Sequence, residues 1–203
     1  ATFTANNFGV YWNASVVTTG FPDGVYNITV FANDTLNNLN SSARVFSVRL
    51  DNTVPNVAEA NFTGAILTGT NHSGTKVLNI SLSDITSSVE TVYFNITNST
   101  GGQNATFTAN NAAGVYWNAT FNTSQFPDGV YNITVYVNDT AGNLNSSARV
   151  YSLRIDNTAP NVAEANFSAL SSGQNKSGSL SLNVSLSDIT SSVETVYFNI
   201  TNS

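Results

Sequence analysis

The feature that most constrains this chain is an internal repeat of about 105 residues. Residues 21–35 read FPDGVYNITVFANDT, and residues 126–143 read FPDGVYNITVYVNDTAGN. Three further segments recur at offsets of 104 or 105 residues: ATFTANN at 1–7 and 105–111, NVAEANF at 56–62 and 161–167, and SLSDITSSVETVYFNITNS at 81–99 and 185–203. A repeat of this length matches the size of one β domain, so the chain is built from copies of a single domain.

Alternating polarity within the repeat predicts β-strands. Leu78, Ile80 and Leu82 fall on one face of such a strand, with polar residues between them. The sequence after Gly129 alternates in the same way, which places Tyr131, Ile133, Val135 and Val137 inward and Asn132 and Thr134 outward. Seven short strands separated by turn signals predict an all-β antiparallel sandwich, with strands at 56–62, 77–83, 89–97, 105–109, 115–121, 130–138 and 149–155.

The segment DGVYNITVYVNDTAGN at 128–143, followed by a strand and by IDNTAP at 155–160, carries a resemblance to a known family. It resembles the tandem immunoglobulin-like repeats of bacterial and archaeal surface proteins. The resemblance implies tandem antiparallel immunoglobulin-like (Ig-like) β-sandwiches of about seven strands each, at the cell surface. It also implies that Tyr26 and Tyr131 are tyrosine-corner residues, whose hydroxyl groups brace the connection before their strand. Ile28 and Ile133 stand where an antibody domain has a disulfide cysteine.

The two copies of the motif DNT-x-PNV, at 51–57 and 156–162, mark boundaries between repeats, because proline is excluded from central strands. We therefore expect three parts. Residues 1–54 are the C-terminal half of an Ig-like repeat, residues 55–156 are a complete repeat, and residues 157–203 are the N-terminal half of another. A neighbouring copy or chain would complete each half.

The composition excludes several kinds of function. Only 9% of the 203 residues are charged and the formal net charge is −6, so the chain offers no basic surface for nucleic acid. There is no cysteine, and His72 is the only histidine, so thiol chemistry and a catalytic triad are not expected. No apolar run approaches the roughly 20 residues that span a bilayer, so we expect no membrane insertion in this segment. These observations predict a protein without enzymatic activity.

Asparagine is concentrated in the acceptor triplet for N-linked glycans, Asn-x-Ser/Thr. Nineteen of the 31 asparagines begin such a triplet, more than twice the number expected if Ser and Thr followed Asn at random. In a strand the Asn and the hydroxyl residue share the outer face, so dense N-glycosylation is the preferred interpretation and a merely polar face is the alternative. The predicted sites are Asn13, Asn27, Asn33, Asn40, Asn61, Asn71, Asn79, Asn95, Asn98, Asn104, Asn118, Asn122, Asn132, Asn138, Asn145, Asn166, Asn175, Asn183 and Asn199.

Four carboxylates form a candidate metal site. In a sandwich of this topology the loops that carry Asp84 and Asp139 lie at the end where the linker with Asp51 enters, and Glu90 can approach the same place. Clustered carboxylates suit calcium, which takes six to eight oxygen ligands. We expect calcium to stiffen the junction, and the alternative is that these residues only stabilise turns.

Together these features predict a structural, N-glycosylated repeat protein of an extracellular filament or stalk, assembled head to tail from copies of itself. The half repeats fit either a window of a longer tandem array or a subunit that completes its neighbour by strand complementation. The alternative function is the repeat region of an adhesin that binds a glycan or a protein.

Overall fold

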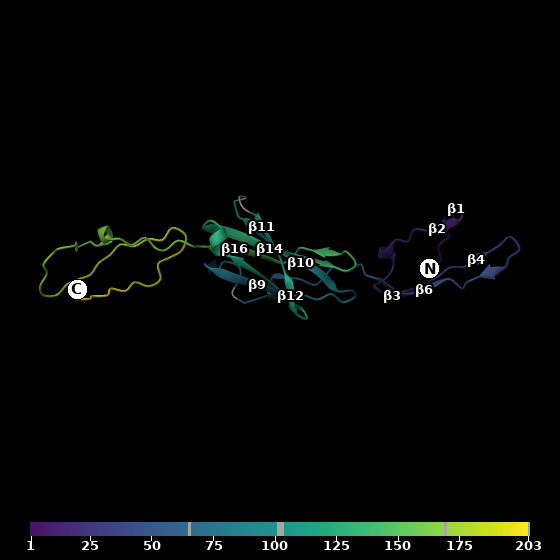
Figure 1. Ribbon diagram of the computed structural model, residues 1–203, viewed down its shortest axis with the longest axis horizontal. Coiled ribbons are helices and arrows are strands. Elements are labelled where there is room, and N and C mark those ends of the chain that lie inside the picture. Colours follow the sequence, from purple (N-terminus) through teal and green to yellow (C-terminus); the bar gives the residue numbers. More distant parts are fainter. Residues whose placement is uncertain (65, 101–103, 169, 203) are drawn as a thin grey trace.

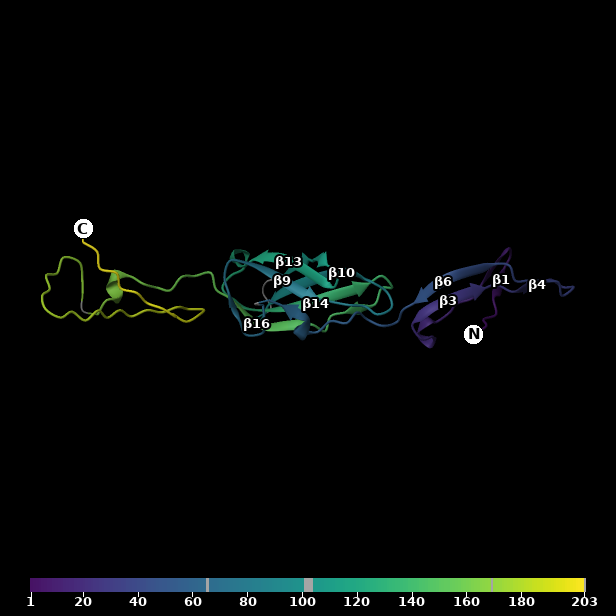
Figure 2. The ribbon, with the colours of Figure 1, turned by 90° about the horizontal axis from the view of Figure 1, so that it is seen from below.

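The computed structural model describes residues 1–64, 66–100, 104–168 and 170–202. Three parts of the chain lie in a row along its long axis, with the complete repeat between two half repeats (Figure 1). The view turned by 90° shows the same arrangement (Figure 2). The described segments contain strands and short 3-10 turns; the turns are η1 (Thr18–Gly20), η2 (Glu59–Asn61), η3 (Thr123–Gln125) and η4 (Glu164–Asn166).

The complete repeat is a sandwich of two sheets. One sheet has the order β11-β10-β14-β16-β8, with β15 paired to β14, and the other has the order β12-β13-β9-β7. The first sheet contains β8 (Asn71–His72), β10 (Val89–Asn98), β11 (Asn104–Thr108), β14 (Gly129–Asp139), β15 (Leu144–Asn145) and β16 (Arg149–Ile155). The second contains β7 (Phe62–Thr63), β9 (Thr75–Ser81), β12 (Asn110–Ala113) and β13 (Tyr116–Asn122). All strand pairs are antiparallel except β16 with β8, which is parallel.

The core lies between the two sheets and confirms the predicted alternation. Leu78 and Ile80 of β9 are fully buried, as are the four inward residues predicted for β14. The aromatic rings of Phe126 and Tyr131 meet edge to face, with centroids 5.5 Å apart. An all-β antiparallel Ig-like sandwich is therefore the fold of the complete repeat, as the sequence predicted.

The predicted tyrosine corner is also confirmed. The Tyr131 hydroxyl donates a hydrogen bond of 2.9 Å to the Pro127 carbonyl oxygen, in the connection that precedes β14. The Tyr26 hydroxyl donates the equivalent bond to the Pro22 carbonyl oxygen at 2.6 Å. Each tyrosine thus ties its strand to the preceding turn, four residues upstream.

Three strand boundaries differ from the prediction. The single strand expected at 105–109 is two strands, β11 and β12, because the chain leaves one sheet at Ala109 and joins the other. The strand expected at 56–62 is reduced to a bridge between Asn56 and Ser83 and to the short β7. The edge strand β8 was not predicted, since two residues are too short to show a period in the sequence.

The half repeats are more open than the complete repeat. Residues 1–54 form three separate two-stranded ribbons, β1 with β2, β3 with β6 and β4 with β5. These strands are β1 (Asn6–Phe8), β2 (Tyr11–Asn13), β3 (Gly24–Thr29), β4 (Ala32–Asn33), β5 (Leu39–Asn40) and β6 (Arg44–Leu50). The described part of residues 157–203 carries two isolated bridges, Asn161 with Ser187 and Phe167 with Val184. Within the described ranges, no helix has the length and apolar character needed to cross a membrane.

Candidate metal centre at the junction between repeats

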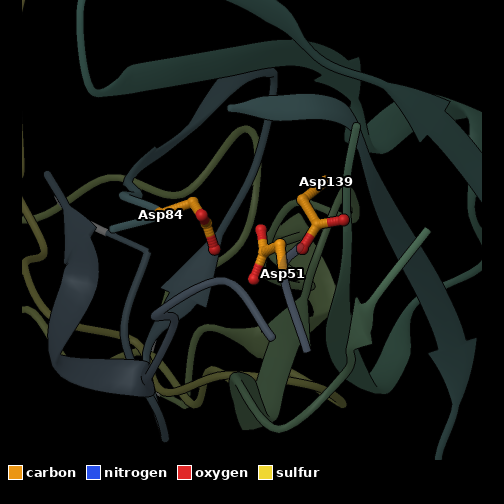
Figure 3. Close-up of side chains that lie close together, drawn as sticks. All are labelled: Asp51, Asp84 and Asp139. Carbon is orange, nitrogen blue, oxygen red and sulfur yellow. The ribbon is translucent and has the colours of Figure 1, made fainter. Parts of the chain in front are cut away.

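Three aspartates from different segments meet where the first half repeat joins the complete repeat (Figure 3). Asp51 follows β6 directly in the linker, Asp84 lies in the loop between β9 and β10, and Asp139 ends β14. One oxygen from each carboxylate lies within 4.8 Å of the others. Asp139 is fully buried and Asp51 is 9% exposed, so the cluster is largely removed from bulk water.

In Asp51 and Asp84, one carboxylate oxygen is held by a local turn and the other has no partner. Asp51 Oδ1 accepts a hydrogen bond from the Thr53 backbone N–H at 3.1 Å. Asp84 Oδ1 accepts from the backbone N–H groups of Thr86 and Ser87 at 3.0 and 2.7 Å. Asp51 Oδ2 and Asp84 Oδ2 are both buried without a hydrogen-bond partner. The turns therefore fix two carboxylates and leave one acceptor oxygen on each unsatisfied.

Asp139 is oriented by the loop that follows it, and the same loop contacts the linker. Its Oδ1 accepts from the backbone N–H groups of Ala141 and Asn143, each at 2.9 Å. The Asn143 side-chain amide donates to Asp139 Oδ2 at 2.9 Å and to the Asp51 carbonyl oxygen at 3.1 Å. Asn143 thus connects Asp139 with Asp51, which lies 92 residues before Asn143 in the sequence.

Further hydrogen bonds attach the first half repeat and the linker to the complete repeat. Asn145 donates its side-chain amide to the Pro55 carbonyl oxygen at 2.8 Å. The Arg49 guanidinium donates to the Thr86 carbonyl oxygen at 2.7 Å. The junction is consequently a contact held by side-chain hydrogen bonds, and the two parts are joined by more than the linker backbone.

The electrostatics of the cluster favour a cation. The hydrogen-bond donors to the three carboxylates described above are neutral amides, so they orient the negative charges without balancing them. Two full charges within 4.8 Å of each other repel by at least about 3 kcal/mol at an effective dielectric constant of 20. Burial adds a desolvation cost to each charge. Oxygen donors in this arrangement suit a hard divalent cation.

The sequence placed four carboxylates at this site, and the structure brings three of them together. Glu90 is exposed and lies outside the group of oxygens that converge among the described residues. The pairing of β10 with β14 shifts its register between Val89 and Thr91, and Glu90 lies at this irregularity. The contributions of Asn143 and Asn145 were not predicted. The sequence signal that could have indicated Asn143 is its spacing from Asp139, because the same spacing recurs between Asp34 and Asn38.

Parts of the same arrangement recur elsewhere in the chain. In the first half repeat, Asp34 Oδ1 accepts from the backbone N–H groups of Leu36 and Asn38, and the Asn38 side chain holds its second oxygen. This side-chain bond, followed by the Asn38 backbone N–H, lowers the pKa of Asp34. Asp34 therefore copies the local geometry of Asp139.

The second junction copies the other two aspartates. Asp156 follows β16 as Asp51 follows β6, and Asp188 is equivalent to Asp84. The Ser191 backbone N–H is the main cause of a lowered pKa at Asp188, and the Asp156 side chain contributes to the same shift. The Arg154 guanidinium donates to the Thr190 carbonyl oxygen at 3.4 Å. Two of the three clustered aspartates, Asp51 and Asp84, thus have equivalents at the second junction.

The described acceptor asparagines are exposed or half-buried, and the Oδ1 atoms of Asn79 and Asn95 are buried. Their asparagines are exposed at Asn13, Asn27, Asn33, Asn40, Asn71, Asn122, Asn175, Asn183 and Asn199, and half-buried at Asn61, Asn79, Asn95, Asn98, Asn118, Asn132, Asn138, Asn145 and Asn166. The side chain of Asn104 lies outside the described part of the chain. In the strand triplets of the complete repeat the middle residue points into the core, as Ile80, Ile96 and Ile133 show. Asn145 differs from the other sites because its amide nitrogen is engaged in the junction.

Comparison with known proteins assigns the family. No curated protein matches the chain. Residues 56–157, which contain both sheets of the sandwich and its buried core, match the family described as "Bacterial Ig-like domain". This match spans half of the chain and begins and ends at the two linkers. The chain therefore belongs to the bacterial Ig-like domain family.

Proposed function

We propose that this chain is a structural segment of an extracellular, N-glycosylated filament or stalk, in which Ig-like repeats assemble head to tail. Domains of this family commonly occur in surface proteins. The observation that carries the proposal is the complementarity of the two half repeats. Residues 158–202 contain the segments equivalent to β7 through β10, and residues 1–54 contain those equivalent to β11 through β16.

The half repeats expose the side chains that such a pairing would bury. In the C-terminal half, Val196, Phe198 and Ile200 are exposed. Their equivalents in the complete repeat, Val92, Phe94 and Ile96, are fully buried between the sheets. Burying these apolar side chains would stabilise an association by about 25 cal/mol for each Å² of apolar surface removed from water.

The positions of the half repeats support a filament as the kind of assembly. They lie at opposite ends of the row, separated by the complete repeat (Figure 1). In this arrangement each half finds its complement in another copy of the repeat, along the same chain or on a second chain. A contact between different surfaces that repeats in one direction and does not close produces a filament.

The assembly is tested with two substitutions in the C-terminal half. Phe198→Asp introduces a charge into the face that the second copy would cover, so we expect it to keep the chain monomeric. Ile189→Asp is the matched control, because Ile189 is 97% exposed and its equivalent Ile85 is 92% exposed in the complete repeat. Light scattering across a concentration series and electron microscopy measure the result. A wild-type chain that stays monomeric would contradict pairing between separate chains, and two variants that assemble alike would contradict pairing through the face that contains Phe198.

Glycosylation of the outer faces is the second part of the proposal. It is supported by the full or partial exposure of the described acceptor asparagines and by the inward direction of the middle residues in the strand triplets. Glycans there would shield the polar faces of the sheets and leave the core unchanged. They would also require export of the chain.

Peptide mass spectrometry of the native material tests this part. We expect glycans at Asn79, Asn95 and Asn132, and lower occupancy at Asn145, whose amide nitrogen bonds the linker. Occupancy as high at Asn145 as at the other three would contradict the role given to the junction. Unmodified peptides across all three strand sites would remove glycosylation from the proposed function.

A further inference from the structure

Aromatic side chains precede many acceptor asparagines by two positions. Tyrosine or phenylalanine occupies that position in six of the nineteen triplets, whereas an aromatic content of 11% predicts about two by chance. The six acceptors are Asn13, Asn33, Asn95, Asn118, Asn138 and Asn199. Residues two apart on a strand share a face, so where the triplet lies in a strand the ring stands next to the acceptor.

In the complete repeat, one of these pairs lines a shallow hollow on the outer face of the first sheet. Tyr93 and Asn95 belong to β10, and the register places Tyr93 directly opposite Tyr136 of β14. Thr106 of β11 and Leu144 of β15 complete the lining, and its exposed surface is almost entirely apolar. The polar face of the sheet therefore contains an apolar surface beside a predicted glycan.

The lining of this hollow suits the face of a sugar ring. A pyranose ring presents C–H groups on its two faces and hydroxyl groups around its edge. The C–H groups carry a slight positive charge, so they pack well against the negatively charged face of an aromatic ring. Such packing also removes apolar surface of both partners from water. Tyr93 is 37% exposed and Leu144 is 56% exposed, so a sugar ring can reach both side chains.

We propose that the first sugar of an N-linked glycan on Asn95 packs in this hollow against the rings of Tyr93 and Tyr136. The inference rests on the glycosylation part of the proposed function. Asn95 itself lines the hollow and lies about 7 Å along the strand from Tyr93, so an attached sugar starts within reach of both rings. Covalent attachment gives the sugar a high effective concentration there, so a weak contact is sufficient.

A sugar held in this way contacts two strands of the sheet. Tyr93 comes from β10 and Tyr136 from β14, and both strands are central to the sandwich. Unfolding separates the two tyrosines and loses the contact. The glycan on Asn95 therefore lies along the sheet and stabilises the complete repeat, instead of extending freely into water.

Two matched controls separate the ring contact from other effects of a glycan. Tyr93→Phe keeps the ring and removes only the hydroxyl group, whereas Tyr93→Ser removes the ring. Asn122 of β13 is an acceptor with Thr120 two positions before it and Thr75 opposite it, so neither position carries a ring.

Thermal unfolding of the full chain with its glycans, and of the same chain produced in a host without N-glycosylation, tests the proposal. Asn95→Gln should lower the melting temperature of the complete repeat by roughly 4 °C more in the glycosylated chain than in the unglycosylated one. Tyr93→Ser should reduce this difference by at least half, and Tyr93→Phe should keep it. Asn122→Gln should show less than half of it. Mass spectrometry verifies that each variant still carries the remaining glycans.

Nuclear magnetic resonance of the glycosylated chain observes the contact directly. We expect nuclear Overhauser effects between the ring protons of Tyr93 or Tyr136 and the first sugar on Asn95, in the wild type and in Tyr93→Phe. The sugar on Asn122 should show no contact with a ring. An Asn95 sugar without ring contacts, or a glycan-dependent stability that Tyr93→Ser leaves unchanged, would overturn the inference.

Failure of this inference is distinguishable from failure of the proposed function. Native material without a glycan on Asn95 contradicts the proposed glycosylation at this site, and the packing of its sugar with it. A glycan that is attached but remains free of the rings contradicts the packing alone. Tyr93 ring signals that change with protein concentration and not with the glycan would assign the hollow to a contact between chains, which also overturns the packing.

Discussion

The same seven residues, GVYNITV, occur at 24–30 and at 129–135, and their environments differ completely. In the complete repeat they begin β14, an 11-residue strand at the centre of a sheet. In the first half repeat they begin β3, a six-residue strand with one neighbour. Ile133 and Val135 are fully buried, whereas Ile28 is 52% and Val30 is 55% exposed. Identical sequence therefore specifies which side chains share a face, and the partner sheet specifies whether that face is buried.

Strand formation itself depends on the partner as well. The sequence VETVYFNIT forms β10 at 89–97, where β11 and β14 flank it. At 193–201 the same residues have neither neighbour and no strand is described for them. Backbone groups in a strand need a neighbouring strand for their hydrogen bonds, so a β-former sequence without a neighbour stays irregular.

Short-range interactions behave in the opposite way, because they survive in the half repeats. The tyrosine corner is present at both Tyr26 and Tyr131. Asp23 and Asp128 make equivalent bonds to the linker after their repeat. The pKa of Asp23 is lowered chiefly by the Thr53 hydroxyl group, and that of Asp128 by the Thr158 hydroxyl group. Contacts across a few residues, or within one ribbon, are thus present without the second sheet.

The largest expected difference between the two regions comes from removing core side chains. Ile133→Ala should destabilise the complete repeat by about 2–5 kcal/mol, because it leaves a cavity between the two sheets. Ile28→Ala should cost less than about 1 kcal/mol in the monomer, because Ile28 is half exposed. Urea unfolding measures both: Trp117 fluorescence follows the complete repeat, because Trp117 packs against its core, and far-UV circular dichroism follows the strands of the first half repeat.

Assembly should abolish this difference. If a second copy covers residues 1–54, Ile28→Ala should weaken the assembled form nearly as much per site as Ile133→Ala weakens the complete repeat. A cost above 2 kcal/mol for Ile28→Ala in the monomer would show that the first half repeat has a core of its own, and the comparison would fail.

A smaller effect is expected at the tyrosine corner. Tyr131→Phe removes the hydrogen bond to the Pro127 carbonyl oxygen and should cost about 1 kcal/mol. Tyr26→Phe removes the same bond in a more exposed place, so water can replace it and the cost should be smaller. Thermal unfolding of the two variants and of the double variant measures the difference. Equal costs would indicate that burial does not strengthen this bond.

Much of the fold was predictable because it depends on local polarity. The inward faces of β9 and β14 and the tyrosine corner follow from residues within one strand or turn. The crossing at Ala109 and the edge strand β8 were not predictable, because they depend on which sheet accepts each strand. That choice is made by contacts between residues far apart in sequence, and the alternation is equally compatible with either sheet.

The candidate site was predictable to a similar degree. Topology placed the loops of Asp84 and Asp139 at the linker end, and the structure places them there. Glu90 lies at a local register shift between β10 and β14 that the sequence does not mark, and it is outside the cluster. The unpartnered oxygens of Asp51 and Asp84 depend on the direction of each side chain within its turn. Such directions are set by individual N–H donors within the folded turn, and the sequence pattern does not reveal them.

The smallest expected effect is a pH dependence of stability, which the complete repeat should show and the C-terminal half should not. His72 of β8 is 8% exposed, and Lys176 stands at the equivalent position of the C-terminal half. The His72 Nε2 atom lies 2.7 Å from the Thr70 hydroxyl oxygen. Burial, and secondarily the positive charge of Lys76, lowers the pKa of His72 below its ordinary value of 6.5.

Because the folded state disfavours the proton, the unfolded chain binds more protons below pH 6.5, and the stability of the complete repeat should fall as pH decreases from that value. Urea unfolding at a series of pH values between 5 and 8 measures the slope, which should stay below one proton. His72→Gln should flatten it, and Lys176→Gln should leave it unchanged, since lysine keeps its proton throughout this range. A slope that persists in His72→Gln would assign the titration to another group, and the edge strand β8 would then have no part in the pH response.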